Sequence, residues 1–159
     1  MIRVLFVCLG NICRSPMAEA VFQHLVDQAE LTDQIEADSA GTTNWNVGRP
    51  AHRGTRDALR RRGIAYEGRA RQVTLADLYE ADYVIAMDTE NIHDLHQSAP
   101  RGVLDDKLHL LLDLAYPGSA REVPDPIYDG RFEQVYELVE AGCRSLLDHI
   151  RGEHGLQST

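Results

Sequence analysis

A cysteine and an arginine, Cys8 and Arg14, stand six positions apart near the start of the chain. A cysteine thiolate is a strong nucleophile, and a guanidinium group can bind two oxygens of one phosphate group. Gly10 and Asn11 tolerate unusual backbone angles, so the chain can turn sharply and point successive N–H groups at one anion. The spacing therefore predicts a loop that holds a phosphate group while Cys8 attacks its phosphorus atom. The loop comprises Leu9, Gly10, Asn11, Ile12, Cys13, Arg14 and Ser15.

The elements on either side of this loop favour the same chemistry. Residues 2–7 form an almost continuous apolar run, typical of a strand buried on both faces, and Ser15-Pro16 opens an expected helix with Ser15 as its cap. Free N–H groups and the helix dipole at that point stabilise a bound phosphate and a Cys8 thiolate, without a metal or cofactor. Ser15 could also hydrogen-bond the sulfur and make it a better leaving group. A buried cysteine in an ordinary turn is the alternative, and the Gly, Asn and Ser-Pro disfavour it.

Further segments alternate between strand and helix patterns. Strands are expected at residues 35–40, 83–87 and 108–112, although a helix is possible for the last, and helices at 15–26, up to about 62, 88–97 and 131–151. Arg60, Arg61 and Arg62 before Gly63 suit a helix C-terminus. We expect an α/β fold, a doubly wound, four-stranded parallel sheet flanked by helices on both faces. Residues 1–159 would form a single domain, with 152–159 as a frayed tail.

Composition excludes several classes of protein. The net charge of −9 argues against general nucleic-acid binding, and no apolar run approaches the about 20 residues that span a membrane. The first residues lack the features of a signal peptide, so we expect a cytoplasmic location. Cys8, Cys13 and Cys143 form neither a disulfide framework nor a structural zinc site, and Cys143 is expected in the core.

The segment Val-Cys-Leu-Gly-Asn-Ile-Cys-Arg-Ser-Pro resembles the motif of the low-molecular-weight protein tyrosine phosphatases. The resemblance extends over essentially the whole chain, through segments in the family's order: Asp38-Ser39-Ala40-Gly41, Trp45-Asn46-Val47-Gly48, Ala70-Arg71-Gln72, Ala86-Met87-Asp88 and Pro124-Asp125-Pro126. It implies hydrolysis of phosphotyrosine, an aryl phosphate ester, through a cysteinyl-phosphate intermediate.

The resemblance also assigns roles outside the loop. Asp125 matches the general acid that protonates the leaving phenolic oxygen, although an Asp-Pro pair alone would indicate only a turn. Trp45 and Tyr128 are candidate walls of the substrate pocket, with core packing as the alternative. Ser39, with Asn11, is expected to support the loop, and Asp88 to cap a helix or brace Arg14. The family implies a reversible Cys8–Cys13 disulfide that protects the nucleophile.

The expected partners are phosphotyrosine proteins, with a bacterial tyrosine kinase as one candidate, and inorganic phosphate or vanadate are expected inhibitors. No nucleic-acid or membrane partner is expected. Three positions depart from the family pattern: Ile127, where many relatives have an aromatic residue, Gly68, where histidine is common, and Asn44, where some have aspartate. These departures concern substrate preference and loop support.

Two other functions remain open from the sequence. A thiol-coupled arsenate reductase shares this loop and fold, but it needs further cysteines near the third strand, and residues 79–97 contain none. A phosphoprotein-binding module without turnover is the other alternative, and the presence of both Cys8 and Asp125 argues against it.

Overall fold

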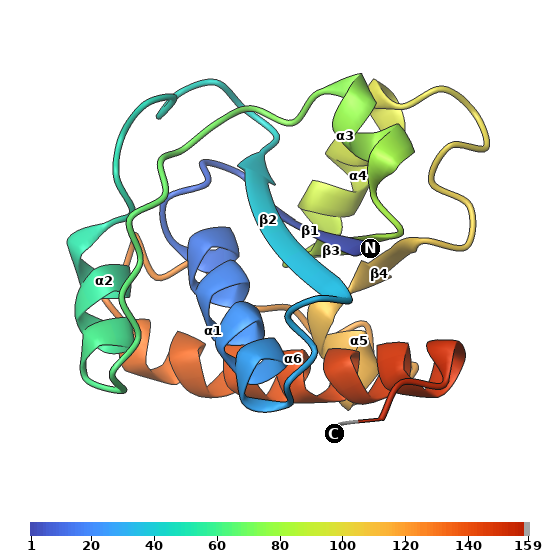
Figure 1. Cartoon of the computed structure of the whole chain (residues 1–159). Helices are drawn as coiled ribbons and strands as arrows, with labels where there is room; N and C mark the ends of the chain where they lie inside the picture. The colour runs from blue at the N-terminus through green and yellow to red at the C-terminus, as the bar shows by residue number, and fades with distance from the viewer. Residues whose placement is uncertain (158–159) are drawn as a thin grey trace.

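A four-stranded, all-parallel sheet lies at the centre of the protein, in the order β2-β1-β3-β4 (Figure 1). The structure is a computed structural model that describes residues 1–157. The strands are β1 (Ile2–Cys8), β2 (Ile35–Gly41), β3 (Tyr83–Ala86) and β4 (Leu108–Leu110). This arrangement confirms the expected α/β fold.

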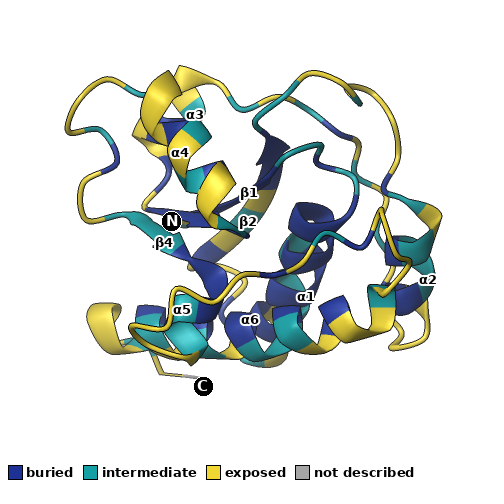
Figure 2. Ribbon diagram, turned by 180° about the vertical axis from the view of Figure 1, so that it is seen from behind, coloured by how far each residue is buried: buried dark blue, intermediate teal, exposed yellow. Residues whose placement is uncertain are grey.

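Helices cover both faces of the sheet. One face packs against α1 (Arg14–Gln28), α5 (Leu111–Ala115) and α6 (Phe132–His154), and the other against α3 (Leu75–Glu80) and α4 (Thr89–Ser98). The shorter α2 (Arg53–Arg60) lies beside α1 and α6. Alternate residues of β1 face opposite layers: Phe6 packs with the α1 side and Val7 with the α4 side. Burial on both faces explains the continuous apolar run, and α1 is buried along most of its length (Figure 2).

The strand order places a functional site by topology alone. After β1 the chain crosses one face through α1 to β2, whereas β4 lies on the far side of β3, so the direction of winding changes between β1 and β3. In open parallel sheets, ligands bind beyond the carboxyl ends of the strands at this point. Cys8 ends β1 and Ala86 ends β3, which brings the predicted loop and the Met87-Asp88 pair to the same edge.

Several boundaries differ from the sequence expectation. Both the strand and the helix considered for the apolar run 108–112 are present, because β4 ends at Leu110 and α5 starts directly at Leu111. The six-residue α3 was not anticipated. Its N-terminus carries a capping box between Thr74 and Asp77. Helix α6 continues three residues past Arg151 to His154, into the segment expected to fray, and residues 158–159 of that segment lie outside the described residues.

Within residues 1–157, none of the helices has both the length and the apolar character that a membrane span requires.

Candidate active site

The loop between β1 and α1 has its carbonyl oxygens turned outward. Five of them accept hydrogen bonds from the segment that follows β2. The oxygen of Cys8 accepts from Thr42 N (2.9 Å), and that of Ile12 accepts from His52 N (2.7 Å). The Gly10 oxygen accepts from Asn46 Nδ2 (3.2 Å). The carbonyls of Leu9 and Cys13 are bound by Thr43 and Thr55. Residues 42–55 therefore fix the loop from outside.

Because the carbonyls point outward, the backbone N–H groups face the opposite way. Those of residues 10–13 donate no hydrogen bond to any described residue. The N-cap of α1 is Cys13, which forms no side-chain capping hydrogen bond, so the first N–H groups of the helix are also unshared. The expectation that Ser15 caps α1 is therefore wrong. This concentration of N–H groups at a helix N-terminus is suited to a phosphate dianion.

Two residues make the tight turn possible, for different reasons. Asn11 has a φ of 56°, in the left-handed region that asparagine tolerates. Gly10 does not adopt such an angle, contrary to the expectation from sequence. A Cβ atom there would lie 2.6 Å from Asn46 Nδ2, so Gly10 is needed for the close approach of the Asn46 side chain.

Cys8 is buried at the base of the loop, and its sulfur lies 2.9 Å from the hydroxyl oxygen of Ser15. The structure thus contains the Cys8–Ser15 contact that the sequence suggested. A hydroxyl at this distance can donate a hydrogen bond to a sulfur that carries negative charge, which stabilises the thiolate as a leaving group.

The guanidinium of Arg14 is buried and held by groups from two other segments. Its Nη1 donates to Asp88 Oδ2 (2.6 Å) and to the carbonyl oxygen of Val123 (2.9 Å). Burial alone would lower the pKa of Arg14, but the nearby Cys8, Asp88 and Asp125 raise it above its ordinary value. The arginine therefore remains a fixed cation next to the nucleophile.

Asp88 has both of the roles considered for it. Its Oδ1 accepts from Asn91 N (2.8 Å) and caps α4, while its Oδ2 binds Arg14. The capped helix thus fixes the carboxylate that orients the guanidinium.

Asp125 lies across the pocket from the loop. Its Oδ2 is 3.6 Å from Arg14 Nη2, and its Oδ1 accepts from Ile127 N (3.2 Å). The segment before it is anchored to the sheet edge, because Val123 N donates to the Met87 oxygen (2.9 Å). A carboxyl group at this place would face a phosphate held by the loop from the opposite side, where a leaving oxygen would lie.

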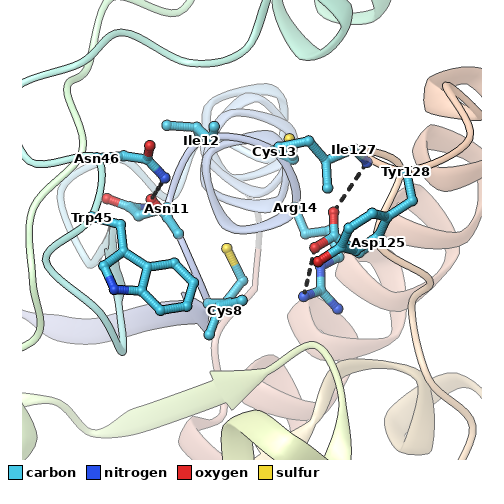
Figure 3. A pocket seen from close by; sticks show the side chains of 12 residues that line it. Cys8, Asn11, Ile12, Cys13, Arg14, Trp45, Asn46, Asp125, Ile127 and Tyr128 are labelled. Carbon is cyan, nitrogen blue, oxygen red and sulfur yellow. Dashed lines mark hydrogen bonds and ion pairs between the residues drawn. The ribbon is translucent and has the colours of Figure 1, made fainter.

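A pocket of about 310 Å³ opens above Cys8. Figure 3 shows Trp45 on one side of the Cys8 sulfur and Tyr128 on the other. Their exposed fractions are 69% and 84%, so neither is a core residue. Ile127 and Asn46 complete the walls, whereas Ser15, Ser39 and Asp88 lie behind the lining and support it.

A buried polar network behind the loop includes two residues that the sequence did not reveal. Asn11 Nδ2 donates to Ser15 Oγ (2.8 Å) and to Ser39 Oγ (3.0 Å). Glu19 Oε1 accepts from Ser39 Oγ (2.6 Å) and from Tyr66 Oη (2.9 Å). The network therefore connects Glu19 and Tyr66 to the hydroxyl group that touches Cys8.

Gly68 leaves the space that this arrangement needs. A Cβ atom at Gly68 would clash with the Tyr66 hydroxyl oxygen, so the missing side chain makes room for the phenol that reaches Glu19. Gly68 is one of the positions that depart from the family pattern, and Tyr66 occupies the space that a side chain there would need.

The thiols of Cys13 and Cys143 are not activated as nucleophiles in this structure. Burial, and the charges of Asp125 and Cys8, raise the pKa of Cys13 to about 12, so its thiol is protonated at neutral pH. Cys143 is fully buried in the core, as expected. All three cysteines are free, and a Cys8–Cys13 disulfide stays a prediction. No group of three or more metal-ligating side chains is arranged around a common point within residues 1–157.

We predict that Glu19→Gln changes how stability depends on pH. Burial raises the pKa of Glu19 in the folded protein above its ordinary value of 4.5. The folded state then holds a proton that the unfolded state releases, so the free energy of unfolding falls as pH rises above about 4.5. Glutamine cannot titrate. The difference in unfolding free energy between wild type and variant should therefore move against the wild type from pH 4 to 7, as urea denaturation can measure.

Glu67→Gln is the matched control, because Glu67 is exposed and forms no hydrogen bond or ion pair with a described residue. A pH-independent difference between wild type and Glu19→Gln would contradict the prediction.

Comparisons with known proteins agree along the whole chain. The family model described as low molecular weight phosphotyrosine protein phosphatase matches residues 3–156. The chain is 49% identical to a low molecular weight protein-tyrosine-phosphatase of Bacillus subtilis, over 98% of this chain and 100% of that protein. It is 41% identical to one of Staphylococcus epidermidis, over 94% of each. The crystal structure of the Bacillus subtilis protein superposes with a TM-score of 0.90, covering 96% of each chain.

Proposed function

The chain belongs to the low molecular weight phosphotyrosine protein phosphatase family, and from this premise we propose that it hydrolyses phosphotyrosine in proteins through a phosphocysteine on Cys8. The observation that carries this assignment is the position of the Cys8 sulfur beneath a ring of unshared N–H groups, with Arg14 beside it and Asp125 opposite. Such a site binds a phosphate, attacks it and protonates what leaves.

In the first step the Cys8 thiolate attacks phosphorus and the ester P–O bond breaks. Asp125 gives its proton to the phenolic oxygen, which leaves as a neutral tyrosine side chain. The N–H groups and Arg14 hold the three non-bridging oxygens of the phosphoryl group. The arrangement of these oxygens changes in the transition state, and the donors need not move to stabilise it. This assignment is supported by the location of Asp125 and Cys8 on opposite sides of the pocket.

In the second step a water molecule attacks the phosphocysteine and Asp125, now a carboxylate, accepts its proton. The S–P bond breaks, and inorganic phosphate leaves. Ser15 stabilises the departing sulfur, which is supported by its 2.9 Å distance from Cys8 Sγ. Ser39 and Asp88 act by positioning, Ser39 through Asn11 and Asp88 through Arg14.

The preference for an aryl ester follows from the aromatic side chains that form the walls of the pocket. Trp45 and Tyr128 flank the entrance, so a phenyl ring can lie between them while its phosphate reaches the buried loop. A phosphoserine side chain is too short to reach Cys8 from the same entrance. The substrates are therefore phosphotyrosine proteins, with a bacterial tyrosine kinase as one candidate. Inorganic phosphate and vanadate would compete for the same N–H groups.

Trapping of the intermediate tests this function. Rapid acid quenching during hydrolysis of p-nitrophenyl phosphate should yield protein that is heavier by one phosphoryl group, and peptide mapping should place that group on Cys8. The Cys13 side chain of the same peptide provides an internal control. Binding of phosphate without any trapped phosphoenzyme or turnover would contradict the proposal and would favour the binding module.

A further inference from the structure

The arginines of this chain are unevenly distributed. Residues 44–72 contain eight of its sixteen basic residues and only two acids, Asp57 and Glu67, although the net charge of the whole chain is −9. These residues form the loop that carries Trp45, helix α2, and the segment that returns along the loop toward α3 (Figure 1). This stretch of the chain is therefore basic, while the rest of the chain is strongly acidic.

Three exposed arginines of this region lie next to the pocket, and we call Arg49, Arg53 and Arg69 the basic rim. Arg49 N donates to the oxygen of Asn46 (2.9 Å), a residue of the pocket wall. Arg69 lies beside the same loop: it pairs with Pro50 in an antiparallel bridge, and its Nη1 donates to the Gly48 oxygen (2.9 Å). The basic rim thus continues the Trp45 side of the entrance.

Arg53 is the first residue of α2, directly after the loop that carries Trp45. It follows His52, whose N–H is bound to the carbonyl oxygen of Ile12 in the phosphate loop. Its side chain is 86% exposed.

The charges of the basic rim are largely uncompensated. Neither Arg49 nor Arg69 forms an ion pair with any described carboxylate. Arg53 contacts Asp57 at 3.6 Å, but Asp57 also pairs with Arg60, so one carboxylate serves two arginines. Three other arginines of residues 44–72 differ, since Arg61 and Arg62 pair with Glu133, and Arg71 pairs with Asp38 and Asp77.

The opposite side of the entrance has a different character. Tyr128 and Ile127 are exposed there, the Asp125 carboxylate lies 3.6 Å from Arg14, and Asp129 is paired with Arg131. These residues therefore offer an acidic peptide no unpaired cation, whereas the basic rim on the other side attracts it. An extended peptide advances about 3.3 Å per residue, so side chains two to four positions from the phosphotyrosine lie about 7 to 13 Å along the entrance, over the basic rim.

We propose that the basic rim binds acidic side chains beside the phosphotyrosine, so that the preferred substrate is a phosphotyrosine within an acidic segment. The inference rests on the proposed function, because it concerns how a peptide lies once its phosphate is in the loop. The rim sets KM through charge, and the chemical step is left to the pocket.

Two matched phosphotyrosine peptides test the proposal, one with Glu and Asp around the phosphotyrosine and one with Gln and Asn at the same positions. The wild type should have a several-fold higher kcat/KM for the acidic peptide, mainly through KM. Raising salt from about 0.02 M to about 0.3 M should reduce this preference, because screening shortens the range of exposed charges. The double variant Arg49→Glu/Arg69→Glu should lose the preference and lower kcat/KM for the acidic peptide about tenfold.

Arg101→Glu/Arg144→Glu changes the net charge equally at exposed sites away from the entrance and should retain the preference. p-Nitrophenyl phosphate contains no peptide and cannot contact the basic rim. If the wild type did not hydrolyse it, the proposed function would be contradicted, but the rim proposal would not. Equal kcat/KM for the two peptides would overturn the rim proposal. The rim proposal would also be overturned if Arg49→Glu/Arg69→Glu kept the preference for the acidic peptide. This holds even if that variant changes the oligomeric state.

Discussion

Replacing Cys8 by serine should lower kcat for an aryl phosphate by about 10⁵-fold or more, since the attacking atom is lost. A serine hydroxyl stays protonated at neutral pH, and the residues that line the pocket include no histidine or lysine that would remove its proton. The phosphate loop keeps its N–H groups and Arg14, so the variant should still bind phosphate. Steady-state hydrolysis and phosphate binding by calorimetry measure the two effects separately.

Cys13→Ser is the matched control, because it makes the same change of atom in the same loop. The pKa of about 12 keeps the Cys13 thiol protonated, so its loss should cost little of kcat. Full activity of Cys8→Ser would exclude the phosphocysteine mechanism. If the variant binds without turnover, it can also capture the physiological substrate from a lysate of the source organism.

Replacing Asp125 by alanine should lower kcat by about 10²- to 10⁴-fold, the range expected when a general acid is removed. The loss should be largest for esters of weakly acidic phenols, which need a proton to leave, and smallest for nitrophenyl esters. Hydrolysis rates for a series of substituted phenyl phosphates measure the loss of kcat and its dependence on the leaving phenol.

Asp129→Ala serves as the control for Asp125→Ala. Asp129 lies four residues further along the same segment and pairs with Arg131, away from the phosphate loop. An Asp125→Ala variant whose kcat is unchanged, or whose loss is equal for all leaving groups, would remove Asp125 from the role of acid.

The elements that sequence predicted well are those with long, one-sided or fully buried patterns. β1 is predictable because Phe6 and Val7 face two different cores and both must be apolar. Helix α3 was missed because six residues show no helical period, although Thr74 and Asp77 form a capping box. The run 108–112 was ambiguous because β4 passes into α5 without an intervening turn.

The candidate site could likewise be predicted only in part from the sequence. Cys8, Arg14 and the residues between them are contiguous, so their chemistry could be inferred from the sequence. Glu19 and Tyr66 stand 47 positions apart and meet only because α1 packs beside the segment after α2. No local pattern encodes such a contact. The Ser15 cap was wrong for a related reason: α1 begins two residues earlier than a Ser15 cap would place it, and the Ser15 hydroxyl is used by Asn11 and Cys8 instead.

The five outward carbonyls of the phosphate loop have a consequence for how this enzyme can diverge. All five are held by residues 42–55, so the wall with Trp45 and the reactive loop form one mechanical unit. Residues 126–131 form no hydrogen bond to residues 8–14 among the described contacts. Substitutions that alter substrate choice can therefore accumulate around Tyr128 at little cost to turnover, whereas changes beneath Trp45 alter selectivity and rate together.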